Sequence, residues 1–229
     1  MENPGENKVV IVGESGVGKT CILDRYINNN FTEGQLATLA AQFCRKNFKL
    51  SDGRSITLDI WDTAGQEKFR SLNRIFYKNA RAVIIVYDIT SKKSFEEAKD
   101  YWRNQIIQNC DSDIVIAIAG NKCDLYEEKE VSDEEGEELA KSICACFSLT
   151  SAKNDSGIDN LFENICQKLL NPDFDFWPNE PKKNEKKENH ENKKEQKNGE
   201  TENKKDNTRD SIKLDGKIKK KKKKCFKIF

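Results

Sequence analysis

The chain has 229 residues, which is enough for one α/β domain and a further segment, and its formal net charge is +1. That average hides two unlike regions, because residues 1–181 carry 21 Lys and Arg against 30 Asp and Glu, whereas residues 182–229 carry 19 against 9. An acidic body with a basic tail is typical of a domain that is tethered to an anionic partner.

The cysteine pattern and the N-terminus narrow the class of protein further. The chain has eight cysteines but no C-x-x-C pair, and its only histidine is His190, so we expect no metal site built from Cys and His. Residues 1–6 have neither a basic start nor an apolar core, which argues against a signal peptide. No apolar run approaches the ~20 residues that span a bilayer. We therefore expect reduced thiols in a cytosolic protein.

The first expected elements are a buried strand at 9–12 and a helix from about residue 21, joined by a glycine-rich loop. The loop reads Gly-Glu-Ser-Gly-Val-Gly-Lys-Thr, which fits the phosphate-loop pattern G-x-x-x-x-G-K-[ST]. Its glycines let successive backbone N–H groups cradle a polyphosphate, and the helix dipole adds positive charge. Lys19 is expected to reach the outer phosphates, and the Thr20 hydroxyl to hold Mg²⁺. A chance glycine-rich turn is the alternative, which the flanking strand and helix disfavour. The predicted phosphate-binding residues of this loop are Gly13, Ser15, Gly16, Val17, Gly18, Lys19 and Thr20.

A long loop is expected between that helix and a hairpin. Residues 28–34 are polar and turn-like and lead into residues 35–42, and long ordered loops are often functional. Strand-like segments at 43–50 and 55–61 flank Ser51-Asp52-Gly53-Arg54, whose Asp-Gly pair predicts a hairpin turn.

The second hairpin strand leads directly into Asp62-Thr63-Ala64-Gly65. A carboxylate at that strand end, beside the phosphate loop, can hold Mg²⁺ through water, and the Gly65 N–H can meet a γ-phosphate oxygen. Taken alone, such an aspartate is more often a turn residue; the phosphate loop upstream favours the metal role for Asp62. Gln66 is then placed to orient an attacking water.

Beyond residue 80, strands and helices alternate. The expected strands are 82–87, 114–119 and 146–149, and the expected helices are 95–107 after a Ser94 cap, a helix capped by Ser132 that runs to about 143, and 158–170. This order predicts an α/β fold with a mostly parallel six-stranded sheet, helices on both faces, and ligands at the carboxyl ends of the strands.

Two loops at such strand ends have the chemistry to read a base. Asp124 in Asn121-Lys122-Cys123-Asp124 can accept two hydrogen bonds, from the ring N–H and the amino group that guanine presents and adenine does not. Asn121 is expected to brace neighbouring loops, and the Lys122 stem to cover the base. Ser151-Ala152-Lys153 is expected to close the other side, with the Ala152 N–H facing the guanine carbonyl. An ordinary polar loop is the alternative.

The periodic pattern ends after Pro172. Residues 182–217 are rich in Glu, Asn and Lys and are expected to be disordered, which predicts a domain at 1–171 and a tail at 172–229. Six lysines, Lys219–Lys224, precede Cys225 and three apolar residues. That position favours an anionic membrane surface over the alternative of a nucleic-acid or nuclear-import segment, so we expect no nucleic-acid partner.

Together, 13–20, Thr38, 61–66, 121–124 and 151–153 resemble the five signature motifs of Ras-like small GTPases. Residues 61–69 and 86–90 look like the Rab family, and 38–43, 94–99 and 117–124 look most like its early-endosomal branch. The resemblance covers about residues 6–170. It implies a P-loop small G-domain that binds GTP and GDP with Mg²⁺ as a monomer.

The resemblance also implies a function. It is that of a GTP-hydrolysing switch that recruits effectors in vesicle and endosomal trafficking, with exchange and activating factors as further partners. The implied location is the cytoplasmic face of intracellular membranes, with cycling through the cytosol. Hydrolysis without an activator is expected to be slow, on the order of 10⁻⁴ per second as in a related small GTPase. A non-hydrolysing nucleotide-binding scaffold is the alternative, and the complete set Thr20, Thr38, Asp62, Gly65 and Gln66 argues against it.

The resemblance further assigns individual residues. Thr38 would meet Mg²⁺ and the γ-phosphate only in the GTP state, and Phe31 would lie edge-on to guanine. The implied effector-binding aromatic triad is Phe43, Trp61 and Phe76. Simple half-burial explains an exposed tryptophan equally well.

Two segments depart from the family pattern. Leu39-Ala40 follows the switch threonine where most relatives have Ile-Gly. The chain also ends with a single cysteine, Cys225, in a segment one residue longer than a C-a-a-X box. We expect lipidation of Cys225; the alternative is weak insertion of Phe226, Ile228 and Phe229 beside the lysines.

Overall fold

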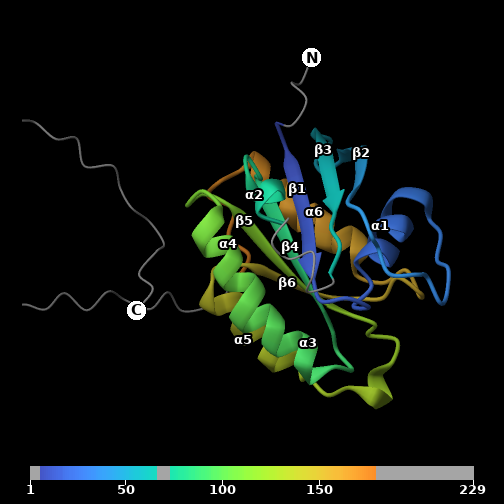
Figure 1. Cartoon of the computed structure of the whole chain (residues 1–229). Helices are drawn as coiled ribbons and strands as arrows, with labels where there is room; N and C mark the ends of the chain where they lie inside the picture. Colours follow the sequence, from blue (N-terminus) through green and yellow to red (C-terminus); the bar gives the residue numbers. More distant parts are fainter. Residues whose placement is uncertain (1–5, 66–72, 179–229) are drawn as a thin grey trace, which may run out of the picture. The chain divides into compact units, whose positions relative to one another are not determined.

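A six-stranded sheet in the order β2-β3-β1-β4-β5-β6 runs through the computed structural model, which describes residues 6–65 and 73–178 (Figure 1). The strands are β1 Lys8–Gly13, β2 Gln42–Lys49, β3 Ser55–Asp62, β4 Ala82–Asp88, β5 Val115–Asn121 and β6 Cys146–Thr150. β2 pairs antiparallel with β3, and the other neighbours pair parallel. The predicted mostly parallel six-stranded sheet is confirmed, whereas Gln66 and the basic tail lie outside the described residues.

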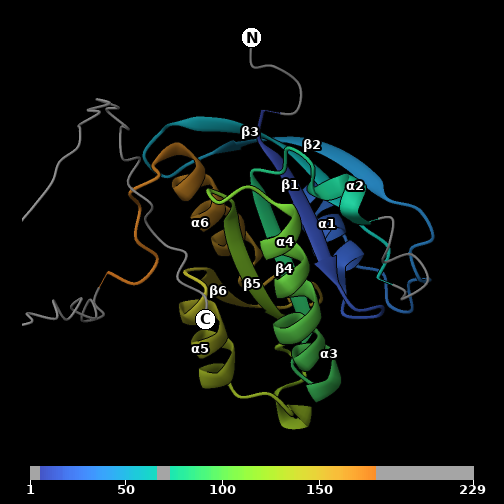
Figure 2. The same cartoon turned by 60° about the vertical axis from the view of Figure 1, so that its left-hand side comes forward.

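Helices cover both faces of the sheet, as expected. They are α1 Lys19–Asn28, α2 Asn73–Tyr77, α3 Lys92–Glu97, a π-helical segment Ala98–Trp102, α4 Arg103–Asn109, a 3₁₀ turn Tyr126–Glu128, α5 Asp133–Ser142 and α6 Ile158–Leu170. In Figure 2, α3, α4 and α5 lie in front of the sheet, with α1 and α6 behind it.

Alternate residues of each inner strand enter two separate cores. Val9 and Ile11 of β1 belong to the cluster that includes side chains of α1 and α6, whereas Val10 and Val12 belong to the cluster on the α3–α5 side. All seven residues of β4 are buried, because a parallel strand covered on both faces has no polar side.

The helix expected at 95–107 starts earlier and is interrupted. Its N-cap is Ser91, whose Oγ accepts a hydrogen bond from the Ser94 N–H at 3.3 Å, so the predicted Ser94 cap is wrong. Ser94 is instead buried and its Oγ accepts from the Asp88 N–H at 3.0 Å. The Ser132 cap is confirmed as a capping box, because its Oγ accepts from the Glu135 N–H and the Glu135 carboxylate accepts from the Ser132 N–H.

The segment after α6 folds back onto the domain. The Trp177 indole N–H donates to the Ala145 carbonyl at 3.0 Å, and the Lys141 ammonium lies 4.6 Å from the centre of the Trp177 ring. Phe176 packs against the core cluster on the opposite face of the sheet. The compact unit extends to Pro178, so the boundary predicted at 171 separates α6 from a segment that packs on the same domain.

The described part of the chain contains no disulfide and no membrane span. Its seven cysteines form no disulfide with one another, and burial raises the pKa of the Cys146 and Cys166 thiols to about 12, which keeps both unreactive. Within residues 6–65 and 73–178, no helix has the length and apolar character needed to cross a bilayer.

Candidate nucleotide-binding site

The glycine-rich loop leaves β1 and turns directly into α1. Gly18 is the N-cap of α1 with φ 93°, and a Cβ there would lie 2.3 Å from Asn121 Nδ2. A Cβ on Gly13 would lie 2.2 Å from the Val86 carbonyl oxygen. Glycine is therefore required at both positions, by backbone conformation at Gly18 and by close approach at both. The positive end of α1 consequently faces the carboxyl ends of the strands.

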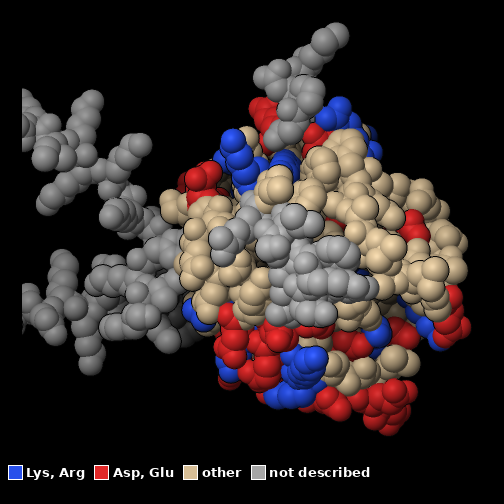
Figure 3. Space-filling model, viewed as in Figure 1, with Lys and Arg blue, Asp and Glu red and all other residues tan. Residues whose placement is uncertain are grey.

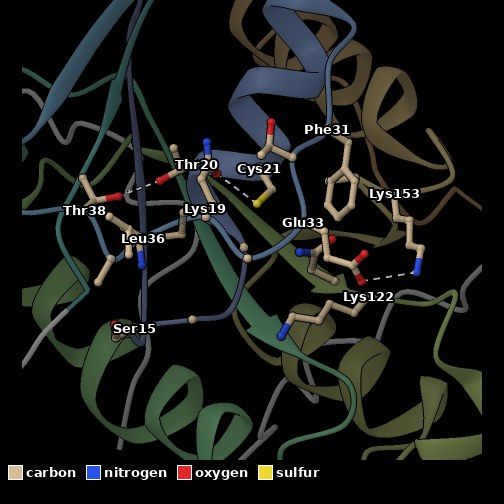
Figure 4. A pocket seen from close by; sticks show the side chains of 18 of the residues that line it. Ser15, Lys19, Thr20, Cys21, Phe31, Glu33, Leu36, Thr38, Lys122 and Lys153 are labelled. Carbon is tan, nitrogen blue, oxygen red and sulfur yellow. Dashed lines mark hydrogen bonds and ion pairs between the residues drawn. The ribbon is translucent and has the colours of Figure 1, made fainter.

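A pocket of about 410 Å³ lies at this end of the sheet. Thirteen of the predicted site residues line it: Ser15, Gly16, Gly18, Lys19, Thr20, Phe31, Thr38, Gly65, Asn121, Lys122, Asp124, Ala152 and Lys153. In the view of Figure 4, Lys19, Thr20 and Thr38 lie toward one end, and Phe31, Lys122 and Lys153 toward the other. Four more predicted residues contact the lining: Gly13, Val17, Asp62 and Ser151.

Lys19 is the buried cation of the pocket. The residue is only 5 % exposed, and its ammonium donates to the carbonyls of Gly13 at 3.0 Å and Glu14 at 2.8 Å. Burial lowers the pKa of Lys19 to about 8, and the nearby carboxylates of Asp62 and Glu14 oppose that shift. Gly65 lies against it, since a Cβ there would be 2.4 Å from Lys19 Nζ.

Three oxygen side chains predicted to hold Mg²⁺ meet next to this lysine. Thr20 Oγ1 lies 2.7 Å from Thr38 Oγ1 and donates to Asp62 Oδ2 at 2.6 Å. Asp62 is fully buried, its other oxygen Oδ1 has no hydrogen-bond partner among the described residues, and burial raises its pKa. An orphaned buried carboxylate oxygen beside two hydroxyls suits a hard cation such as Mg²⁺, so these residues fit the expected metal.

Asn121 and Ser151 hold the opposite end of the pocket. Asn121 is buried, donates to the Val17 carbonyl at 2.8 Å and accepts from Thr150 Oγ1 at 3.2 Å. It therefore ties the phosphate loop to the end of β6. Ser151 Oγ donates to Asp124 Oδ1 at 2.5 Å, which orients the carboxylate that is predicted to read the base.

Two residues that sequence reasoning did not single out support this end. Asp88 Oδ2 lies 2.6 Å from Lys122 Nζ, so the end of β4 holds the side chain expected to cover the base. Arg25 of α1 donates from Nε to the Ala152 carbonyl at 2.8 Å. Asp88 is the last residue of a buried strand and was identifiable in principle from that position, whereas nothing local distinguishes Arg25 from other helix residues.

The aromatic triad assembles next to the pocket. The ring centroids of Phe43 and Trp61 are 5.1 Å apart, and those of Trp61 and Phe76 are 5.5 Å apart. Phe43 is 48 % exposed and the neighbouring Ile75 is 70 % exposed, whereas Trp61 and Phe76 are half-buried. The group is thus an open apolar surface supported by partly buried rings.

Lys19 lies in a strand–loop–helix unit of a mostly parallel sheet, and the pocket is at the carboxyl ends of the strands. This geometry defines a P-loop nucleotide-binding protein. The model of the Ras family matches residues 8–171. The chain belongs to the Ras family of small GTPases, which bind and hydrolyse GTP, and it is a GTPase.

Its similar proteins include several Rab proteins. The chain is 44% identical over 170 residues to the Ras-like GTP-binding protein RYL2 of Yarrowia lipolytica, covering 71% of this chain and 80% of the relative. It is 40% identical to human Ras-related protein Rab-21, covering 71% and 72%, and 39% identical to human Ras-related protein Rab-8B, covering 71% and 78%.

Proposed function

We propose that the protein is a Rab-type switch that recruits effectors to intracellular membranes, with endosomes as the expected compartment, when it holds GTP. The observation that carries this proposal is the continuity between the aromatic triad and the metal-binding cluster. Trp61 directly precedes Asp62 in β3, and Phe43 faces Trp61 across the β2–β3 pairing. A change in the metal or phosphate contacts of Thr38 and Asp62 would therefore alter the position of the aromatic triad.

The proposed chemistry divides along the pocket. The phosphate loop and Lys19 bind the polyphosphate, Gly65 approaches the γ-phosphate, and Gln66 orients the attacking water. Thr20, Thr38 and Asp62 would hold Mg²⁺, which would neutralise charge on the phosphate oxygens. At the other end the groups that would meet guanine line the pocket, namely Phe31, Lys122, Asp124, Ala152 and Lys153. Ser151 orients Asp124, and Asn121 braces the phosphate loop.

Replacing Phe76 by alanine is expected to weaken effector binding about thirtyfold or more, because truncating a central interface aromatic typically costs at least ~2 kcal/mol. Nucleotide affinity should be unchanged, since Phe76 does not line the pocket. The measurement is capture of partners from the protein's own cells on GTP-analogue-loaded and GDP-loaded protein. Tyr126→Ala is the matched control, because Tyr126 is an aromatic that is 62% exposed in the 3₁₀ turn Tyr126–Glu128. Identical partner sets for the two nucleotides would refute the switch.

Membrane attachment is proposed to have an electrostatic and a lipid component. Acidic side chains gather along the lower edge of the domain in Figure 3, near α3 and α5, and an anionic leaflet repels them. Lys219–Lys224 would each contribute about 1 kcal/mol near such a leaflet, an attraction screened over roughly 8 Å at physiological salt. A lipid chain on Cys225, worth about 0.8 kcal/mol per buried CH₂, would provide the second component.

Substitution Cys225→Ser is therefore expected to move most of the protein from membranes to the cytosol. Imaging of an N-terminally labelled full chain measures this and identifies the compartment. Cys144→Ser is the control, because Cys144 is an exposed cysteine of the domain itself. Intact-mass measurement of the membrane fraction provides the second readout, and an unmodified Cys225 found there would leave only the electrostatic component.

A further inference from the structure

Arg25 links α1 to the loop that follows β6, 127 residues further along the chain. Its Nε donates to the Ala152 carbonyl at 2.8 Å, and its Nη2 donates to the Lys153 carbonyl at 3.2 Å. Both acceptors belong to residues that line the pocket, whereas Arg25 does not line it. The Arg25 guanidinium therefore anchors the loop at 151–153 from outside the pocket lining.

The same guanidinium is fixed to the end of its own helix. Nη1 donates to the Asn29 carbonyl and to Asn29 Oδ1, each at 3.0 Å. Asn29 is the C-cap of α1 in the left-handed conformation, and its N–H donates to the Arg25 carbonyl. All three guanidinium nitrogens are thus engaged, and a planar fork held at one end presents the other two donors in a fixed direction.

A chain of contacts runs from this fork to the base-reading carboxylate. The carbonyl of Lys153 and the N–H of Asn154 belong to one planar peptide unit, so fixing the carbonyl direction also fixes the N–H direction. The Asn154 N–H donates to Ser151 Oγ at 3.0 Å, and Ser151 Oγ donates to Asp124 Oδ1 at 2.5 Å. The position of Asp124 therefore depends on a loop that Arg25 anchors.

The geometry points to Arg25 as a specificity-determining positioning residue for the nucleotide base. It sets the loop at 151–153, and through Ser151 the carboxylate of Asp124, so that the pocket selects guanine and releases it slowly. This inference rests on the proposed guanine-binding roles of Asp124 and Ala152. Lysine cannot replace it fully, because one ammonium on a flexible stem does not reproduce a rigid fork.

The test compares three nucleotides on the full chain carrying Arg25→Ala or Arg25→Lys. GDP presents every group of guanine, and inosine diphosphate lacks the amino group facing Asp124. 2-Aminopurine riboside diphosphate lacks the carbonyl facing Ala152 and, with it, the ring N–H facing Asp124. The two discrimination ratios are the affinity for GDP divided by that for inosine diphosphate, and the affinity for GDP divided by that for 2-aminopurine riboside diphosphate. In Arg25→Ala we expect GDP to dissociate at least tenfold faster and both ratios to be at least threefold lower, with Arg25→Lys in between. Arg81→Ala is the matched control, because the Arg81 guanidinium pairs with Asp113 at 3.1 Å outside the pocket.

The ratios separate positioning from a general structural role. A variant that merely loosens the fold would bind all three nucleotides more weakly by one common factor, and unchanged ratios would overturn the inference while leaving the guanine site intact. If the wild-type protein binds the three nucleotides equally, the guanine assignment is wrong and the inference falls with it. Arg25→Lys keeps the positive charge, which provides a folded variant if Arg25→Ala is unstable.

Discussion

Asp124→Asn is expected to lower the affinity for GDP and GTP at least a thousandfold and to create affinity for xanthine nucleotides. The carboxylate accepts two hydrogen bonds in the proposed complex, and an asparagine amide presents a donor where guanine also presents one. A pocket built to pair a substrate group discriminates by factors of about 10⁴ when that pairing is lost. Xanthine carries a carbonyl at the position of the guanine amino group, which matches the new donor. Ser151 Oγ, 2.5 Å from Asp124 Oδ1, is placed to hold the amide oxygen in the same way.

Equilibrium competition among GDP, xanthosine diphosphate and ADP on wild type and variant measures the change of specificity. Asp111→Asn is a matched control, since Asp111 lies away from the nucleotide pocket and loses the same charge. Retained GDP affinity in Asp124→Asn would show that another group reads the base.

Lys19→Ala is expected to reduce GDP affinity about a hundredfold or more at pH 7.5. The ammonium lies at the phosphate end of the pocket, and hydrogen bonds to charged groups contribute about 1.5–3 kcal/mol each. Two such contacts to phosphate oxygens correspond to at least two factors of ten. No other cation is as deeply buried in the described lining, where Lys122 and Lys153 are more exposed.

The depressed pKa of Lys19 adds a pH dependence with a definite sign. In the free protein its pKa is about 8, and contact with phosphate raises it, so binding takes up a proton between those two values. GDP affinity of the wild type should therefore fall as the pH rises from 7 to 9. Lys19→Ala should lack this component, which calorimetry in buffers of different ionisation enthalpy can verify. A wild-type profile that matches the variant's over this range would contradict the assignment of Lys19.

Local sequence determined the strands, most of the helices and the order of the motifs, but it did not predict helix α2. The apolar runs at 9–12 and 82–87 needed no tertiary information, because strands buried on both faces are continuously apolar. The glycines around Lys19 were equally readable, because the conformation they permit is a property of the residue itself. Helix α6 was predicted with its observed bounds, Ile158–Leu170, from its apolar periodicity.

Helix α3 marks where local signals became ambiguous. Ser91 and Ser94 are both good N-cap residues, and their spacing gives no preference between them. The end of β4 determines which serine is the N-cap. The Asp88 N–H donates to Ser94 Oγ, so the Ser94 hydroxyl is buried and Ser91 caps the helix. The π-helical segment Ala98–Trp102 was likewise invisible to a periodicity argument over a window of about a dozen residues.

The supports of the pocket were decided by tertiary structure alone. The motif around Asp124 was predictable from its residue types, but the contacts that place it come from Ser151 and, through the loop at 151–153, from Arg25. An arginine in the last turn of a helix has many possible partners, and no spacing rule selects a carbonyl 127 residues away. The hydrogen bond from the Trp177 indole N–H to the Ala145 carbonyl was equally unpredictable, because no spacing rule selects that partner either. The chemical groups of a motif can be read from its local sequence, whereas hydrogen bonds between distant segments form only after the sheet has brought those segments together.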